Sequence, residues 1–142
     1  MLIESLLSLC LHNTSAYVGA WSYHEDRKFV VEDENGVAKL HNQDHDRVGI
    51  LCHNEKEHFQ VSKFENSFFN TAVAATYGKV FYSYGNFNFF WDVGLVGGYS
   101  IEQNFVSPLF AGVGIRYPTK VVDLEVELIG NALSASVAIR LW

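Results

Sequence analysis

The C-terminal part of this chain alternates apolar residues with polar or small residues almost without interruption. The two clearest stretches are residues 121–129, VVDLEVELI, and residues 133–142, LSASVAIRLW. A period of two indicates a β-strand, because successive side chains of a strand point to opposite faces. One face is uniformly apolar, whereas the other mixes glycine, serine, alanine and charged residues. This asymmetry is typical of a membrane β-barrel, which is apolar outside and polar or small inside.

Eight segments of the sequence have strand character, and the connections between them alternate in length. The segments are residues 15–25, 47–54, 58–65, 71–82, 87–100, 107–117, 121–129 and 133–142. The first connection, residues 26–46, is long and charged, whereas the second, fourth and sixth are brief. In an up-and-down sheet the odd-numbered connections lie at one rim and the even-numbered ones at the other. Longer loops at one rim and short turns at the opposite rim are typical of outer-membrane barrels. We therefore expect an all-β fold, an eight-stranded antiparallel up-and-down β-barrel of the outer-membrane type.

The predicted lumen side of the strands carries charges of both signs. The seventh strand carries the acidic residues Asp123, Glu125 and Glu127. The basic residues Arg116 and Arg140 lie on the two adjacent strands. An unpaired charge in a narrow lumen is prohibitively costly, so we expect these groups to pair. On the first strand, the alternation predicts an outward aromatic girdle of Tyr17, Trp21 and Tyr23. The alternative for the acidic row is the solvated face of a soluble sandwich.

Length and charge limit the other possibilities. The 142 residues suit a single β-barrel domain, residues 1–142, with the barrel in 15–142 and either a short amphipathic helix or a leader remnant in 1–14. Residues 1–14 lack the basic region of a signal peptide, but their apolar residues share one helical face. The net charge of −6 leaves no basic stripe for phosphates, so we expect no nucleic-acid partner.

The cysteines and most of the histidines suggest no metal site. Cys10 and Cys52 lack metal-ligand spacing, and we expect two buried thiols rather than a disulfide. Four histidines lie in or beside polar connections and are expected on the solvated surface, namely His41, His45, His53 and His58. The HNQDHD stretch at residues 41–46 lacks the fixed helical spacing of strong metal motifs. We expect no metal and no cofactor.

Two residues with catalytic potential are predicted at one mouth of the barrel. His24 lies on the inward face near the end of the first strand, and Ser67 follows the end of the third strand at the same rim. A serine activated by a histidine is the minimum for acyl transfer, because the imidazole takes the hydroxyl proton as a carbonyl is attacked. The alternatives are a structural histidine and a turn cap formed by Asn66 and Ser67.

Several short segments form a collinear set over residues 16–142. They are AWSYHEDR, HNQDHDRVGI, FENSFFN, AATYG, FNFFWDVGLVGGYS, AGVGIRYP and VVDLEVEL. In this order they resemble the lipid A palmitoyltransferase (PagP) family, which are eight-stranded outer-membrane barrels with an N-terminal amphipathic helix. The resemblance implies transfer of a palmitoyl chain from a phospholipid to lipid A, using a His, an Asp and a Ser near the outer mouth. The His matches His24 and the Ser matches Ser67, whereas the Asp position holds Asn66, which cannot offset an imidazolium charge.

The resemblance implies a PagP-like acyltransferase in the outer membrane of a Gram-negative bacterium, encoded by the bacterium or by a phage. Its partners would be phospholipid, lipid A and the membrane, and we expect a monomer. A lipid A deacylase, with a comparable Ser–His pair on a similar barrel, is the second enzymatic hypothesis. A non-enzymatic surface protein and a soluble β-barrel binding module also stay open. The soluble barrel would need large apolar side chains inside, whereas the predicted inner face is glycine, alanine, serine and charge.

Overall fold

The computed structural model describes residues 2–24, 30–32, 35–40, 42–99 and 108–142. Within them, helix α1 (Leu2–His12) precedes eleven strands. The strands are β1 (Thr14–His24), β2 (Val30–Glu32), β3 (Ala38–Leu40), β4 (Asp44–His45), β5 (Val48–His53), β6 (Glu57–Glu65), β7 (Thr71–Tyr84), β8 (Phe87–Gly97), β9 (Leu109–Pro118), β10 (Val122–Ile129) and β11 (Ala132–Arg140).

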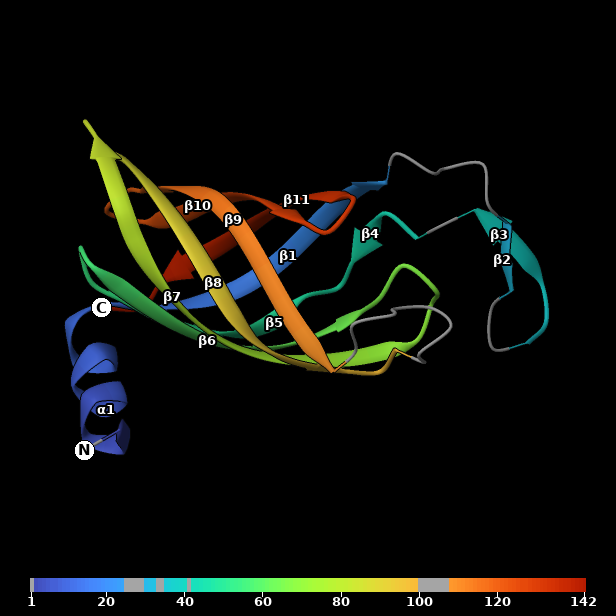
Figure 1. Cartoon of the computed structure of the whole chain (residues 1–142), viewed down its shortest axis with the longest axis horizontal. Helices are drawn as coiled ribbons and strands as arrows, with labels where there is room; N and C mark the ends of the chain where they lie inside the picture. Colours follow the sequence, from blue (N-terminus) through green and yellow to red (C-terminus); the bar gives the residue numbers. More distant parts are fainter. Residues whose placement is uncertain (1, 25–29, 33–34, 41, 100–107) are drawn as a thin grey trace.

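Eight antiparallel strands, β1 and β5 to β11, form the barrel, and each pairs with its neighbour along the chain. The pairing of β11 with β1 closes the sheet, with His24 opposite Ala132 near one end. Closure removes the exposed strand edges that promote aggregation. Helix α1 and the C-terminus lie at one rim, and the β2–β3 hairpin lies beyond the other, as Figure 1 shows. The predicted eight-stranded up-and-down barrel and its short N-terminal helix are therefore confirmed.

The outside of the barrel is apolar and its inside is polar. On β10, Leu124 and Val126 are 43% and 45% exposed, whereas Asp123 is fully buried. Other strands show the same outward row of large aliphatic side chains, including Val73, Val93, Leu95, Val113, Val137 and Ile139. So large a continuous apolar surface indicates contact with a membrane or a partner. Among the described residues, no helix is long and apolar enough to cross a bilayer.

One residue predicted to face outward, Tyr17, lies inside the barrel and is 2% exposed. The register of β1 against β11 shifts between Tyr17 and Gly19, and the extra residue, Val18, points outward. A β-bulge of this kind reverses which residues of a strand face inward. Beyond the bulge, Trp21 and Tyr23 are exposed as predicted. The prediction for Tyr17 was wrong because a strict alternation does not reveal a bulge.

The charged side chains of the lumen form the predicted pairs near the rim that carries α1. Arg116 Nε donates to Glu125 Oε1 at 2.6 Å, and Arg140 Nη2 donates to Asp123 Oδ1 at 2.7 Å. The Tyr17 hydroxyl also donates to Glu125, at 2.8 Å. Asp123 and Glu125 thus exchange water for charge-assisted hydrogen bonds, which makes their burial tolerable. Glu127 does not form the predicted pair with Arg116 or Arg140, and its buried Oε1 atom has no hydrogen-bond partner among the described residues.

Three of the histidines expected on the surface are buried in the lumen, namely His45, His53 and His58. His53 Nε2 lies 3.1 Å from Asp123 Oδ2. His58 is fully buried, and a Cβ atom at Gly78 would lie only 2.4 Å from its Cε1 atom, so glycine makes room for the ring. The prediction of surface exposure was wrong because it was based on the polar residues beside these histidines in the sequence. In this barrel the inner face of the strands is itself polar, so polar neighbours do not indicate exposure to solvent. His41 lies outside the described residues.

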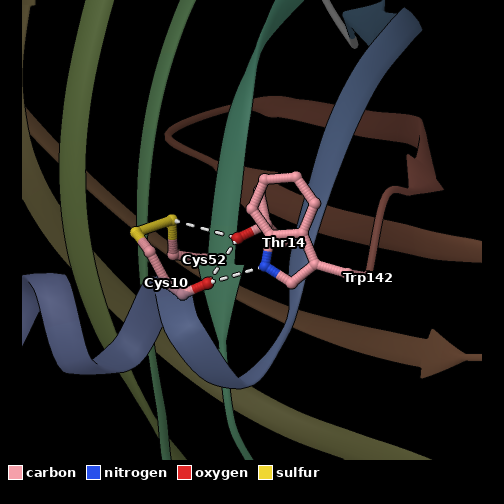
Figure 2. The surroundings of a disulfide bond; sticks show 4 residues. All are labelled: Cys10, Thr14, Cys52 and Trp142. Atoms are coloured by element: carbon pink, nitrogen blue, oxygen red, sulfur yellow. Dashed lines mark hydrogen bonds between the residues drawn. A yellow bond between two sulfur atoms is a disulfide. The ribbon is translucent and has the colours of Figure 1, made fainter.

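A disulfide between Cys10 and Cys52 joins α1 to β5. The expectation of two buried thiols was therefore wrong. Figure 2 shows the surroundings of this bond, in which Thr14 Oγ1 and Trp142 Nε1 both donate to the Cys10 carbonyl oxygen, at 2.7 and 3.2 Å. The two cysteines are 42 residues apart, and only the return of the helix to the barrel rim brings them together. Persistent disulfides are typical of oxidising compartments such as the periplasm.

Reduction of the disulfide should destabilise the folded barrel by about 2–4 kcal/mol, because the unfolded chain loses a long loop constraint. Urea unfolding in detergent micelles, with and without reductant, measures this difference. A Cys10→Ser/Cys52→Ser double variant should match the reduced wild-type protein and be insensitive to reductant. An equal effect of reductant on both proteins would contradict a stabilising bond.

Substitution of Val126 by arginine should destabilise the barrel in phospholipid vesicles by about 2–4 kcal/mol if the outward face of β10 meets hydrocarbon. The matched control is Val121→Arg, the same change at an exposed residue in the β9–β10 turn. Reversible urea unfolding from vesicles gives both values. Similar losses in the two variants would argue against a lipid-facing belt.

Candidate functional site

The part of the lumen toward the loop rim contains a cavity of about 510 Å³. Apolar side chains from the strands β6 to β9 contribute one part of its lining, namely Phe64, Ala74, Val96 and Phe110. Polar and charged side chains contribute another part, namely Arg47, Gln60, Thr76 and Glu127. His24 and Ser67 also line it, at the end of β1 and in the β6–β7 loop. The cavity therefore offers an apolar wall and reactive side chains in one space.

His24 and Ser67 lie in hydrogen-bond contact, 43 residues apart in the sequence. Ser67 Oγ is 2.6 Å from His24 Nε2. Ser67 is 5% exposed, so its hydroxyl is largely protected from bulk water. The distance is within the reach that a general base needs to remove a hydroxyl proton. The structure thus brings together the two residues that the sequence placed at one mouth.

Asn66 is fully buried and shapes the loop that carries Ser67. Its Oδ1 accepts the backbone N–H groups of Phe68 and Asn70, at 2.9 and 3.1 Å. Its Nδ2 donates to the Gly98 carbonyl oxygen at 2.8 Å. Both ends of the amide are therefore used by backbone groups, and the bond from the Phe68 N–H to Oδ1 is that of an Asx turn. An aspartate would place a carboxylate oxygen against the Gly98 carbonyl, which explains why asparagine suits this position.

The same loop contains a residue in an uncommon backbone conformation. Phe69 has a φ of 62°, in the left-handed region that bulky residues rarely adopt. Two backbone hydrogen bonds hold this geometry, from Asn66 to Asn70 at 2.8 Å and from Phe69 to Asn66 at 3.0 Å. Strained residues persist only where the surrounding structure over-determines them, as the hydrogen bonds of Asn66 do here.

Two further residues extend the His24–Ser67 pair, and sequence analysis did not select them. Ser22 Oγ lies 3.4 Å from His24 Nε2 and 2.6 Å from His45 Nε2. His45 Nδ1 lies 2.5 Å from the backbone oxygen of Glu65. Ser22 precedes His24 by two positions and therefore shares its inward face, so strand alternation alone could have identified Ser22 as a neighbour of His24. The place of His45 depends on the pairing of β4 with β1, which puts it opposite Ala20, and no sequence pattern indicates this.

Burial shifts the pKa of two side chains near the mouth. His45 lies on β4, outside the eight spanning strands, and desolvation lowers the pKa of its imidazole, while the hydrogen bond to the Glu65 backbone acts in the opposite sense. Burial also raises the pKa of Tyr99 to about 12, so its hydroxyl stays protonated near neutrality. The Tyr99 ring packs edge-on against Phe68, with ring centroids 6.2 Å apart.

Within the part of the chain that the structure describes, no three His, Cys, Asp or Glu residues are placed to hold a metal ion. His45, from the HNQDHD stretch, instead bonds to Ser22 and to the Glu65 backbone.

Comparisons with known proteins bear on the fold. No protein-family model and no curated protein matches this chain. A solved structure, described as "De novo design of transmembrane beta-barrels", matches 91% of this chain and 95% of its own chain, with a TM-score of 0.58 and 12% sequence identity. This chain has the fold of a transmembrane β-barrel. At such low identity the similarity concerns the fold alone.

Substitution of Asn66 by aspartate should lower the free energy of unfolding by about 1–3 kcal/mol, because the Gly98 carbonyl loses its donor and faces a buried carboxylate. The matched control is Asn86→Asp in the exposed β7–β8 turn, where the same change should cost less than about 0.5 kcal/mol. Urea unfolding in micelles measures both. An Asn66→Asp variant as stable as the wild-type protein would refute the role assigned to the amide.

Proposed function

We propose that this protein is an outer-membrane acyltransferase that moves a fatty acyl chain from a phospholipid to lipid A in a Gram-negative bacterium. The observation that carries the proposal is the contact between Ser67 Oγ and His24 Nε2, 2.6 Å apart, beside a partly apolar cavity. A serine and a histidine at this distance form the minimal apparatus for covalent acyl transfer.

In the proposed reaction, Ser67 Oγ attacks the carbonyl carbon of a phospholipid ester while His24 Nε2 accepts the hydroxyl proton. The ester C–O bond then breaks, and His24 returns the proton to the oxygen of the departing lysophospholipid. The acyl chain is now esterified to Ser67. A lipid A hydroxyl next attacks this ester, His24 accepts its proton, and return of that proton to Ser67 Oγ restores the enzyme.

Three features support a lipid substrate and an outer-membrane setting. The outward face of the barrel carries large aliphatic side chains, such as Leu124 and Val126, that suit contact with hydrocarbon. The apolar side of the cavity suits an acyl chain. The Cys10–Cys52 disulfide suits the periplasmic side of that membrane. The collinear resemblance to the lipid A palmitoyltransferase family agrees with all three.

A second candidate, an acyl hydrolase or lipid A deacylase, is favoured by the polar part of the cavity. Arg47, Gln60 and Glu127 line the same space as the Ser–His pair. A roomy polar site of this kind can hold ordered water. Water would then replace the lipid A hydroxyl in the second step and release a free fatty acid.

Mass spectrometry of lipid A from cells with and without the expressed protein tests the proposal. The transferase should add one acyl chain to lipid A, whereas the deacylase should remove one and release fatty acid. Ser67→Ala should abolish either change, and His24→Gln should reduce the rate by about 10²–10⁴-fold.

The control is Ser83→Ala, which removes a hydroxyl of an exposed residue that donates to Asn88 Oδ1 at 2.8 Å, near the opposite rim. It should leave the lipid A product as in the wild type. Unchanged lipid A and no fatty acid release by the wild-type protein would overturn both enzymatic candidates and leave the non-enzymatic surface protein.

A further inference from the structure

We infer that Ser22 and His45 are positioning residues for the His24–Ser67 pair, forming a hydrogen-bonded chain that ends at the backbone carbonyl of Glu65. This inference rests on the proposed acyl-transfer function and describes how the histidine of that site is held. The chain runs from Ser67 through His24 and Ser22 to His45, with contacts of 2.6, 3.4 and 2.6 Å, and it ends with 2.5 Å to Glu65.

The direction of each hydrogen bond follows from the last acceptor in this series, the Glu65 carbonyl oxygen. A carbonyl oxygen can only accept, so His45 Nδ1 carries the proton that is donated to Glu65. In the neutral imidazole the other nitrogen, Nε2, must then be an acceptor. The Ser22 hydroxyl therefore donates its proton to His45 Nε2, which leaves the Ser22 oxygen with lone pairs available for His24.

His24 Nε2 consequently faces two hydroxyl groups with different tasks. Before reaction, Nε2 is unprotonated and accepts the hydroxyl proton of Ser67, at 2.6 Å. After Ser67 attacks, Nε2 carries that proton and needs an acceptor in its imidazolium state. Ser22 Oγ lies 3.4 Å away with its own proton committed to His45, so it can accept this N–H. Hydrogen bonds from a charged donor are shorter and stronger than neutral ones, which favours closure of this contact in the charged state.

Burial makes this chain effective. Ser22, Ser67 and His45 are 4%, 5% and 9% exposed, so little water competes for their hydrogen bonds. In such surroundings hydrogen bonds are electrostatically stronger than in water. The pairing of β4 with β1 also places His45 on the strand next to the one that carries Ser22 and His24. The side-chain amide of Asn66, by contrast, forms hydrogen bonds with the backbone of Phe68, Asn70 and Gly98.

The rate at which a hexadecyl fluorophosphonate labels Ser67 tests this inference in purified, folded protein, since the reaction needs no lipid acceptor. Ser22→Ala should lower the maximal labelling rate by about 10-fold, the value of one charge-assisted hydrogen bond. The half-saturating reagent concentration should stay within about twofold, because the reagent still binds as before. Ser22→Thr, which keeps a hydroxyl, should restore most of the wild-type rate.

A double-mutant cycle adds a readout that a merely structural role would not produce. If His45 acts only by orienting the Ser22 hydroxyl, His45→Ala should slow labelling as Ser22→Ala does, and the double variant should be no slower than either single variant. Ser83→Ala is the matched control for loss of a hydroxyl and should be labelled at the wild-type rate. Circular dichroism and heat-dependent gel mobility verify that each variant is folded.

The outcomes separate this inference from the proposed function. Wild-type labelling rates in folded Ser22→Ala, or equal losses in Ser22→Ala and Ser22→Thr, would overturn the positioning role. Labelling that depends on Ser22, with no change in lipid A, would support the positioning role and refute the lipid A substrate. A wild-type protein that is not labelled at Ser67 would overturn both.

Discussion

The interior of an eight-stranded closed sheet is just wide enough for side chains, so a charge placed there loses nearly all of its water. The chain meets this constraint with opposite charges on adjacent strands. Arg116 bonds to Glu125 and Arg140 bonds to Asp123, each within hydrogen-bond distance. This pairing allows Asp123 and Glu125 of β10 to turn inward, which leaves the aliphatic face of the strand outside. The sidedness of the barrel, and hence its suitability for a bilayer, depends on it.

The candidate site depends on a second constraint, the β-bulge in β1. Before the bulge, Tyr17 points into the lumen and joins the charged network, and beyond it Ser22 points inward. Had the alternation continued unbroken from Tyr17, the residues at even positions, Ser22 and His24 among them, would face outward. Bulges are often found where a strand must re-aim a side chain near a functional site. The one inserted residue, Val18, therefore allows Tyr17 to point into the lumen near the α1 rim and Ser22 and His24 to point inward near the loop rim.

The loop that carries Ser67 has a local structural reason for asparagine, rather than aspartate, at position 66. Asparagine at position 66 donates to the Gly98 carbonyl and accepts from two backbone N–H groups of its own loop. A carboxylate could make only the second kind of bond. The hydroxyl of Ser22, which His45 orients, also approaches the imidazole of His24. A neutral hydrogen-bonded chain of this kind adds an acceptor for an imidazolium without adding a buried charge.

Local periodicity was sufficient to predict the eight barrel strands and the apolar outer face. The meeting of His24 with Ser67 was predicted from the alternation of residues 21–24, beyond the bulge, and from the rim at which the two strand ends lie. The charge pairs of the lumen followed from the same rule. Sequence alone did not reveal the bulge at Val18, the Cys10–Cys52 bond or the burial of His45. These features arise from register shifts and from contacts between segments far apart in the chain, and neither leaves a periodic pattern. Composition and alternation thus determined which face of the sheet is apolar, whereas only the tertiary structure decided the partners that depend on register and long-range contacts, such as Glu125 for Tyr17 and Ser22 for His45.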